Sequence, residues 1–147
     1  MDRGVAVVLT ALVGGFVALQ GPINSNLGKT IGNFQAAFFS FATGTIILAV
    51  IAALARGGLG QISEARTLAP QYLIGGALGA CYVSTVIVTV RTLGAGGIVA
   101  ATIAGQLTMG VIIDQFGLLG LDKDPISVSK AIGVLLLAAG TLLVVRG

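Results

Sequence analysis

The charged residues of this chain lie at the ends of long uncharged segments. Four intervals contain no Asp, Glu, Lys or Arg: 4–28, 30–55, 67–90 and 92–113. A helix needs roughly 20 mostly apolar residues, at ~1.5 Å each, to cross the hydrocarbon core of a bilayer. Each of the four is long enough to cross. A fifth interval, 131–145, is shorter, but residues 126–130 can extend it because the stem of a lysine can lie along a helix while its ammonium reaches the headgroups.

The pattern therefore predicts an all-α integral membrane bundle of five transmembrane helices. The expected spans are 4–27, 34–55, 70–91, 96–118 and 127–146. Between them we expect a polar loop over 60–69, a glycine turn over 94–97 and a turn over 122–125. Short connections make consecutive helices antiparallel neighbours, so residues 1–147 are expected to form a single transmembrane domain. Pro22 lies inside the first span and predicts a kink or local unwinding there.

Composition excludes several classes of function. Hydrophobic residues make up 56% of the 147 residues and charged residues 9%, whereas a soluble domain carries about 25% charged residues. There is no His and one Cys, so we expect no metal site and no cofactor. No serine has a candidate base, so we expect no enzyme. The net charge of +3 comes from residues in loops and at helix ends, which predicts contact with membrane lipid and not with nucleic acid.

Small residues recur at four-residue spacing within the spans. Gly75 and Gly79 form one pair, Ala101 and Gly105 form another, and the second span carries a stripe of Ala36, Ser40 and Gly44. Such faces let helix backbones approach closely in lipid. We predict helix packing at these residues, while hinges for a moving bundle remain an alternative.

Four polar side chains are expected at membrane depth: Gln20, Asn24, Tyr82 and Gln106. A polar group within the bilayer is expensive unless it has a hydrogen-bond partner or faces water. These side chains therefore either line an aqueous cavity, as substrate-binding residues, or bond to one another across helices.

Asp114 is the acidic residue nearest to a predicted span interior. It continues a ladder at four-residue steps, Thr102, Gln106, Gly110 and Asp114, and lies close to a membrane boundary. Because alternate spans run in opposite directions, the cations expected on its side are Arg3, Arg56 and Lys130. Asp114 is either a structural ion-pair partner, with Arg56 as a leading candidate, or a group that couples transport to protons or substrate.

Positive charge is divided unevenly between the two sides. The side of the N-terminus carries Arg3, Arg56, Arg66, Lys123 and Lys130, and the other carries Lys29, Arg91 and Arg146. The excess favours an N-terminus in the cytoplasm. Because the excess is small, the chain can be expected to insert both ways and to pair with an inverted copy of itself.

Three short segments resemble a known family. Residues 19–28, together with 105–106 and 113–117, are similar to those of the small YdcZ-like proteins of the bacterial drug/metabolite transporter superfamily. The resemblance implies a multi-pass protein of the bacterial inner membrane that forms one inverted-repeat unit. It further implies an antiparallel homodimer, or a heterodimer with a sibling chain. Related small multidrug exporters carry an acidic residue midway along the first helix, and this chain has none there, which argues against their cation/proton exchange.

We therefore expect a small-molecule secondary transporter, an exporter, that works as an antiparallel dimer. Its central polar cavity would be lined by Gln20, Asn24, Tyr82 and Gln106 and would suit an uncharged polar substrate, because nothing there offsets the desolvation of a cation. The alternative is a non-transporting membrane subunit that assembles with a partner through its glycine-rich faces.

Overall fold

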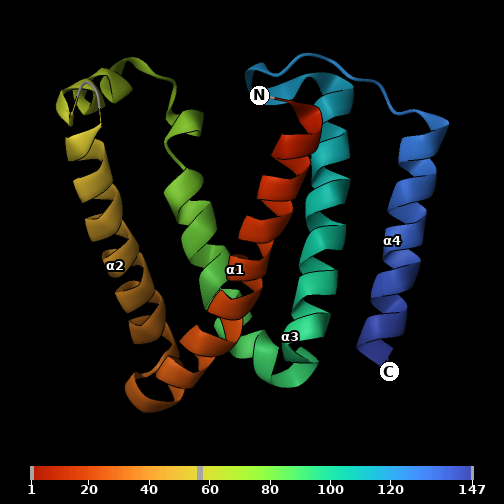
Figure 1. The fold of residues 1–147 in the computed structure, drawn as a ribbon, viewed down its shortest axis with the longest axis horizontal. Coiled ribbons are helices and arrows are strands. Elements are labelled where there is room, and N and C mark those ends of the chain that lie inside the picture. The colour runs from red at the N-terminus through yellow and green to blue at the C-terminus, as the bar shows by residue number, and fades with distance from the viewer. Residues whose placement is uncertain (1, 56–57, 147) are drawn as a thin grey trace. The chain divides into compact units, whose positions relative to one another are not determined.

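The structure, a computed structural model, describes residues 2–55 and 58–146, and of Arg3 only the backbone. Its elements are α1 (Arg3–Ile31), α2 (Asn33–Leu54), η1 (Gly60–Thr67), η2 (Pro70–Tyr72), α3 (Gly75–Phe116), η3 (Leu118–Gly120) and α4 (Val128–Arg146), where η marks a 3₁₀ helix (Figure 1). The described residues form no strand. All four α-helices are long and apolar enough to cross a membrane. The predicted all-α membrane bundle is confirmed.

Helix α3 contains two of the five predicted spans. Its backbone leaves the helical region at Gly94, where φ is 68° and ψ is 171°. This region is open to glycine and strained for residues with a Cβ. The turn divides α3 into arms of residues 75–93 and 95–116, each about the length needed to cross a bilayer. Gly96 and Gly97 belong to the second arm, so the turn is tighter than the expected 94–97 segment.

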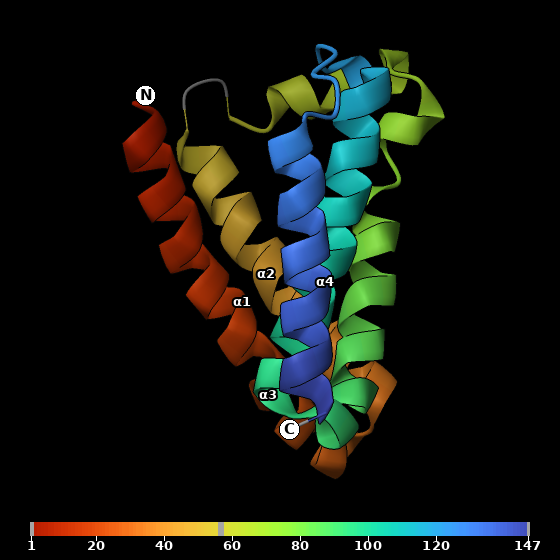
Figure 2. The same cartoon turned by 90° about the vertical axis from the view of Figure 1, so that its right-hand side faces the viewer.

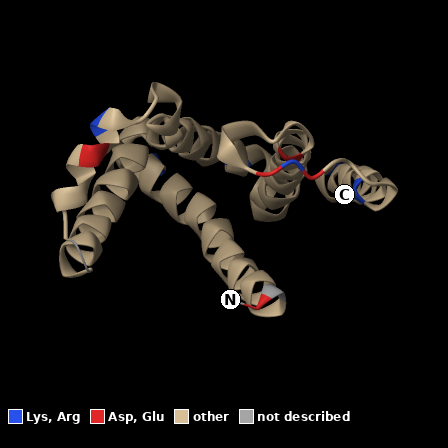
Figure 3. Ribbon diagram, turned by 90° about the horizontal axis from the view of Figure 1, so that it is seen from above, with Lys and Arg blue, Asp and Glu red and all other residues tan. Residues whose placement is uncertain are grey.

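The chain divides into two compact units, Met1–Val88 and Thr89–Gly147, which are described separately below. Within each, charged residues lie at helix ends and in loops, while the helix bodies are uncharged (Figure 3). The expectation that residues 1–147 form a single domain remains a prediction.

The first unit begins with the antiparallel hairpin of α1 and α2. The Asp2 carboxylate caps α1 by accepting hydrogen bonds from the backbone N–H groups of Gly4 (2.9 Å) and Val5 (3.3 Å). Gly32 joins the two helices with φ 99°, and a Cβ there would lie against the Gln35 side chain. The helices diverge from this turn (Figures 1 and 3), so their contacts concentrate near Gly32.

Helix α1 is longer than predicted, since it ends at Ile31 and not near residue 27. Lys29 lies in its last turn, where a positive charge favours the carbonyl end of the helix dipole. The helix continues through Pro22 without a break in its assignment, and Figure 1 shows it changing direction in its C-terminal part. The change of direction agrees with the expected kink, while α1 remains helical through Pro22.

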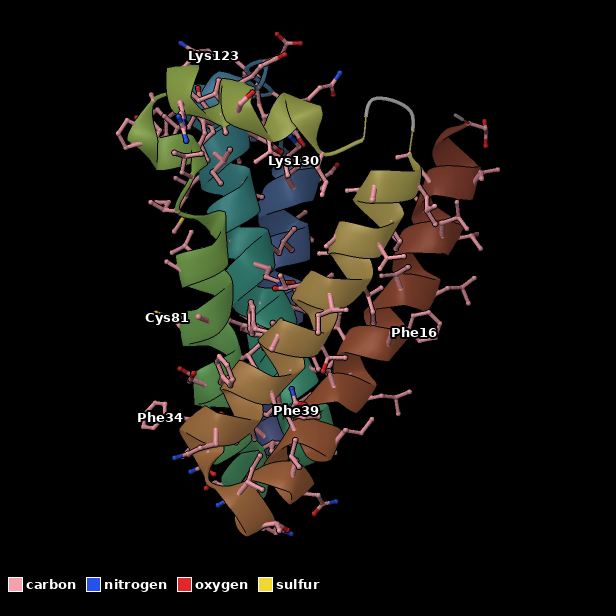
Figure 4. All side chains as sticks on the ribbon, turned by 90° about the vertical axis from the view of Figure 1, so that its left-hand side faces the viewer. Phe16, Phe34, Phe39, Cys81, Lys123 and Lys130 are labelled. Atoms are coloured by element: carbon pink, nitrogen blue, oxygen red, sulfur yellow. The ribbon has the colours of Figure 1, made fainter. Side chains whose placement is uncertain are left out.

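The core of the first unit lies where α2 meets the first arm of α3. Ala36 and Ala37 of α2 are buried against Val83 and Ile87 of α3, and Leu27 and Tyr82 pack at the edge. The two alanines lack bulky side chains, so the helices can approach closely. Large apolar residues elsewhere point outward, as Phe16 and Phe34 do (Figure 4). Their exposure is expected of surfaces that face lipid.

In the second unit, α4 packs along the second arm of α3 (Figure 2). A Cβ at Gly97 would lie 3.7 Å from the Val145 side chain, an ordinary van der Waals distance, so the two helices lie close together at this point. The Thr141 hydroxyl also donates a hydrogen bond to the Ala100 carbonyl oxygen across this contact, at 3.0 Å. Small residues and one hydroxyl thus hold these helices together.

Two predicted span ends differ from the helix ends, and one expected loop is partly helical. The third span begins at Gly75 and not at residue 70, because Pro70 opens the separate turn η2. The fourth ends at Phe116 and not at 118, since Gly117 has a left-handed conformation that stops the helix. The segment expected to be a polar loop over 60–69 forms the 3₁₀ helix η1.

Candidate functional site

Two amide side chains of α1 share one hydroxyl of α2. Gln20 and Asn24 are one helical turn apart, so they face the same neighbour. The Asn24 Nδ2 donates a hydrogen bond to Ser40 Oγ at 3.2 Å, and the Gln20 Nε2 donates to the same oxygen at 3.5 Å. The shared hydroxyl joins the two helices at membrane depth, and the longer bond from Gln20 is the weaker of the two.

Asn24 is the more deeply placed of the two amides. Its exposed fraction is 5%, and only Asn24 and Ser25 are buried polar residues in the described part of the chain. A buried amide without a partner costs about 1–3 kcal/mol, so the bond to Ser40 removes much of this penalty. Among the described residues, no buried side-chain nitrogen or oxygen is left without a hydrogen bond.

A small pocket opens beside these amides within the first unit. Its lining comes from α1 and the first arm of α3: Val17, Gln20, Gly21, Asn24, Tyr82, Val83, Val86 and Ile87. None of these residues is charged. Its volume is about 10 Å³, which is room for roughly one water molecule. In this conformation of a single chain, the pocket is too small for a metabolite.

The structure brings together three of the four predicted cavity residues. Gln20, Asn24 and Tyr82 line the pocket. Gln106 lies on the second arm of α3, in the second unit, where its side chain is exposed. Gln20 lines the pocket and also bonds across to Ser40 of α2, and its role in substrate binding remains a prediction.

Ser40 is the site residue that sequence reasoning missed. It was counted only as a small member of the packing stripe on the second span, next to the buried Ala36 and Ala37. Its hydroxyl was the available signal, because a serine on the face that packs against another helix also supplies a hydrogen-bonding oxygen.

Lys130 is the described cation nearest Asp114. Its Nζ lies 3.9 Å from the Asp114 carboxylate but only 2.7 Å from that of Asp124. The Asp124 N–H also donates to the Asp114 carbonyl oxygen at 2.9 Å. The carboxylates are substantially exposed, so each pair contributes about 0–1 kcal/mol. The candidate Arg56 and the side chain of Arg3 lie outside the described residues.

Lys130 thus joins the end of α3 to the start of α4. The Ser127 hydroxyl caps α4 by accepting a hydrogen bond from the Lys130 N–H at 3.2 Å. The Gln115 side-chain oxygen accepts another from the Ile126 N–H at 2.7 Å. In the described part of the chain, no group of three or more His, Cys, Asp or Glu is placed to hold a metal ion.

The predicted packing residues differ in their surroundings. A Cβ at Gly79 would lie 3.2 Å from the Phe41 ring of α2, so this glycine permits a close contact. A Cβ at Gly75 or Gly105 would meet no atom of the described residues within 4 Å, and Ala101 is exposed. Helix packing through Gly75, Ala101 and Gly105 remains a prediction.

Comparison with known proteins agrees with the resemblance noted in the sequence. The chain matches the family described as "Putative inner membrane exporter, YdcZ" over residues 5–143. Searches among curated proteins and among solved structures gave no match. The family match extends from the start of α1 into the last turns of α4, so it covers all the membrane-spanning helices. This multi-pass membrane protein therefore belongs to the YdcZ family.

Proposed function

We propose that the chain is a secondary transporter that exports a small molecule across the bacterial inner membrane. The observation that carries the proposal is an uncharged pocket in which the polar side chains of Gln20, Asn24 and Tyr82 come together. Polar side chains are expensive at membrane depth, and they occur there mainly on substrate or ion pathways. The family description, an inner-membrane exporter, supports the same activity.

The proposed substrate is uncharged and forms hydrogen bonds. The pocket offers two amides and a phenol, with valine and isoleucine around them and no carboxylate. A cation entering such a site would lose its hydration without gaining an opposite charge. A neutral molecule with hydroxyl or amide groups would find donors and acceptors there instead.

The proposed working unit is an antiparallel pair of chains, either two copies or one copy with a sibling chain. The pocket has room for roughly one water, so a metabolite requires a wider cavity. A second chain in inverted orientation would provide facing polar residues and the symmetry that alternating access uses. Gln106, exposed on α3, is assigned by this proposal to the same cavity.

Water access to position 20 provides a direct test. In a Cys81→Ser background, which removes the exposed native thiol, Gln20→Cys and Gln106→Cys should react with a charged, membrane-impermeant methanethiosulfonate in proteoliposomes. Phe16→Cys is the control on the same helix, because Phe16 does not line the pocket and its side chain is 69% exposed. A thiol there should face acyl chains and remain unmodified.

Transport measurements complete the test. A thermal-shift screen of uncharged sugars, amino alcohols and amides, with tetraphenylphosphonium as the cationic comparison, would supply the substrate to be tested. Gln20→Ala and Gln106→Ala should each lower its flux into proteoliposomes by about tenfold or more, as expected if one hydrogen bond of roughly 1.4 kcal/mol is lost. Unchanged flux in both variants would rule out the proposed cavity.

The small volume of the pocket favours a second candidate, a non-transporting subunit that assembles through its glycine faces. In that case the bonds from Gln20 and Asn24 to Ser40 are purely structural. Protection of Gln20→Cys and Gln106→Cys from the reagent, at the level of the Phe16→Cys control, would support the subunit and contradict the transporter.

A further inference from the structure

The connection between α2 and α3 contains a 3₁₀ helix that is unusually long. Helix η1 covers eight residues, Gly60–Thr67, whereas runs beyond three or four residues are uncommon because the hydrogen bonds are poorly aligned. It lies between the end of α2 and the turn η2 that precedes α3 (Figures 1 and 2). All of these residues belong to the first unit.

The sequence of η1 matches the geometry of a 3₁₀ helix. With three residues per turn, side chains at positions i and i+3 lie directly above one another. One such line, which we call the apolar stripe, runs through η1 and its two flanking residues: Leu59, Ile62, Ala65 and Leu68. The other two lines are formed by Gly60, Ser63 and Arg66, and by Gln61, Glu64 and Thr67. The helix is therefore amphipathic, although an α-helical period of 3.6 does not reveal it.

The apolar stripe has little cover from the rest of the unit. Leu59 is 45% exposed, Ile62 64% and Leu68 53%. Each large aliphatic side chain gains about 1.5–3 kcal/mol when it is fully removed from water. A stripe of three such side chains left in water would therefore be strongly unfavourable.

The attachment of η1 decides which surface can cover the stripe. It is joined on one side to α2, which ends at Leu54, and on the other to α3, which begins at Gly75. Both helices are apolar enough to cross the membrane, so η1 is held at the level where they leave it. The nearest apolar phase is the edge of the hydrocarbon core.

We propose that η1 lies in the membrane interface, with the apolar stripe towards the acyl chains. Amphipathic helices of this kind bury their apolar face about 5–10 Å into the boundary between headgroups and chains. Arg66, on a neighbouring line, would then reach lipid phosphate. Tyr72, Leu73 and Ile74, which are about half exposed, would continue the same belt up to the start of α3. This inference does not depend on the transport proposal.

The chain contains no tryptophan, so the fluorescence of a single introduced tryptophan can report how deeply each line of η1 side chains lies in the membrane. Ile62→Trp introduces a single fluorophore on the apolar stripe, and Gln61→Trp introduces one on the adjacent polar line. The protein would be reconstituted into liposomes of phosphatidylcholine and phosphatidylglycerol, with or without lipids brominated on their acyl chains. Acrylamide would serve as the aqueous quencher.

We expect Ile62→Trp to emit at shorter wavelength and to be quenched by brominated lipid at least about twofold more than Gln61→Trp, with the reverse order for acrylamide. Leu68→Trp, on the same apolar stripe, should give the same emission and quenching as Ile62→Trp. Agreement between the two variants would show that the result is not peculiar to one substituted position. Equal acrylamide quenching at 61 and 62 would contradict the proposal by placing η1 in water. Protection of position 62 from both quenchers would also contradict it, because a protein surface would then cover the stripe.

Discussion

At the scale of single residues, Ser40 connects the candidate site to the stability of the fold. Its hydroxyl oxygen accepts from the amides of Gln20 and Asn24, and Asn24 is buried. Removing the acceptor leaves two donors inside the membrane without this partner. Loss of the Ser40 hydroxyl would therefore weaken the contact between α1 and α2.

We expect Ser40→Ala to lower the free energy of unfolding by about 1–3 kcal/mol, because the buried Asn24 amide loses its bond. The measurement is unfolding by SDS in mixed micelles, followed by far-UV circular dichroism. Ser84→Ala is the matched control, since Ser84 is half-buried on α3 and its hydroxyl makes no interhelical bond within the described residues. If Ser40→Ala and Ser84→Ala unfold alike, the shared bond contributes nothing.

At the scale of elements, the turn inside α3 depends on one residue. Gly94 combines φ 68° with ψ 171°, a conformation that costs an L-residue about 1–3 kcal/mol. Gly96 lies two residues later in regular helix, and a Cβ there would meet Val144 at an ordinary 3.9 Å. Gly94 is therefore required by its backbone conformation, whereas the position of Gly96 can accept a Cβ without a clash.

We expect Gly94→Ala to destabilise the protein by about 1–3 kcal/mol through backbone strain. Gly96→Ala should be neutral or stabilising by about 0.5–1 kcal/mol, because alanine is the better helix former. Thermal unfolding in detergent, monitored by size-exclusion fluorescence, compares them. Equal melting temperatures for both variants would mean that the turn can relax into another conformation.

At the scale of the whole molecule, orientation in the membrane depends on a few charges. Five spans place the two termini on opposite sides, and positive residues favour the cytoplasm. The side of the N-terminus has only a small excess of Lys and Arg. Single charges are therefore expected to shift the balance between the two orientations.

Reporters fused to the C-terminus can measure that balance. Alkaline phosphatase is active outside the cytoplasm, and green fluorescent protein is fluorescent inside it. We expect the native chain to give both signals. Lys29→Gln with Arg146→Gln should raise the phosphatase signal, while Arg66→Gln with Lys123→Gln should lower it. A ratio that neither pair of substitutions changes would exclude dual topology set by these charges.

Much of the fold could be predicted from the sequence, because crossing a bilayer is a property of consecutive residues. Long uncharged intervals predict α1, α2 and the two arms of α3, and α4 is predicted once Lys130 is allowed to extend a shorter interval. Gly94 lies in the turn expected between the third and fourth spans. The boundaries were less predictable. Helix α1 continues past Lys29 because a positive charge is favourable in the last turn of a helix. The apolar stripe of η1 repeats every three residues, so the α-helical period of 3.6 does not detect it.

The candidate site was only partly predictable. The sequence by itself determined that Gln20, Asn24 and Tyr82 are polar groups at membrane depth that need partners, because lipid offers none. Only the tertiary structure decided that the first two share Ser40 and that Lys130 lies closest to Asp124. These partners come from different helices or from the two sides of a turn, so only the packing of those elements brings them within hydrogen-bond distance.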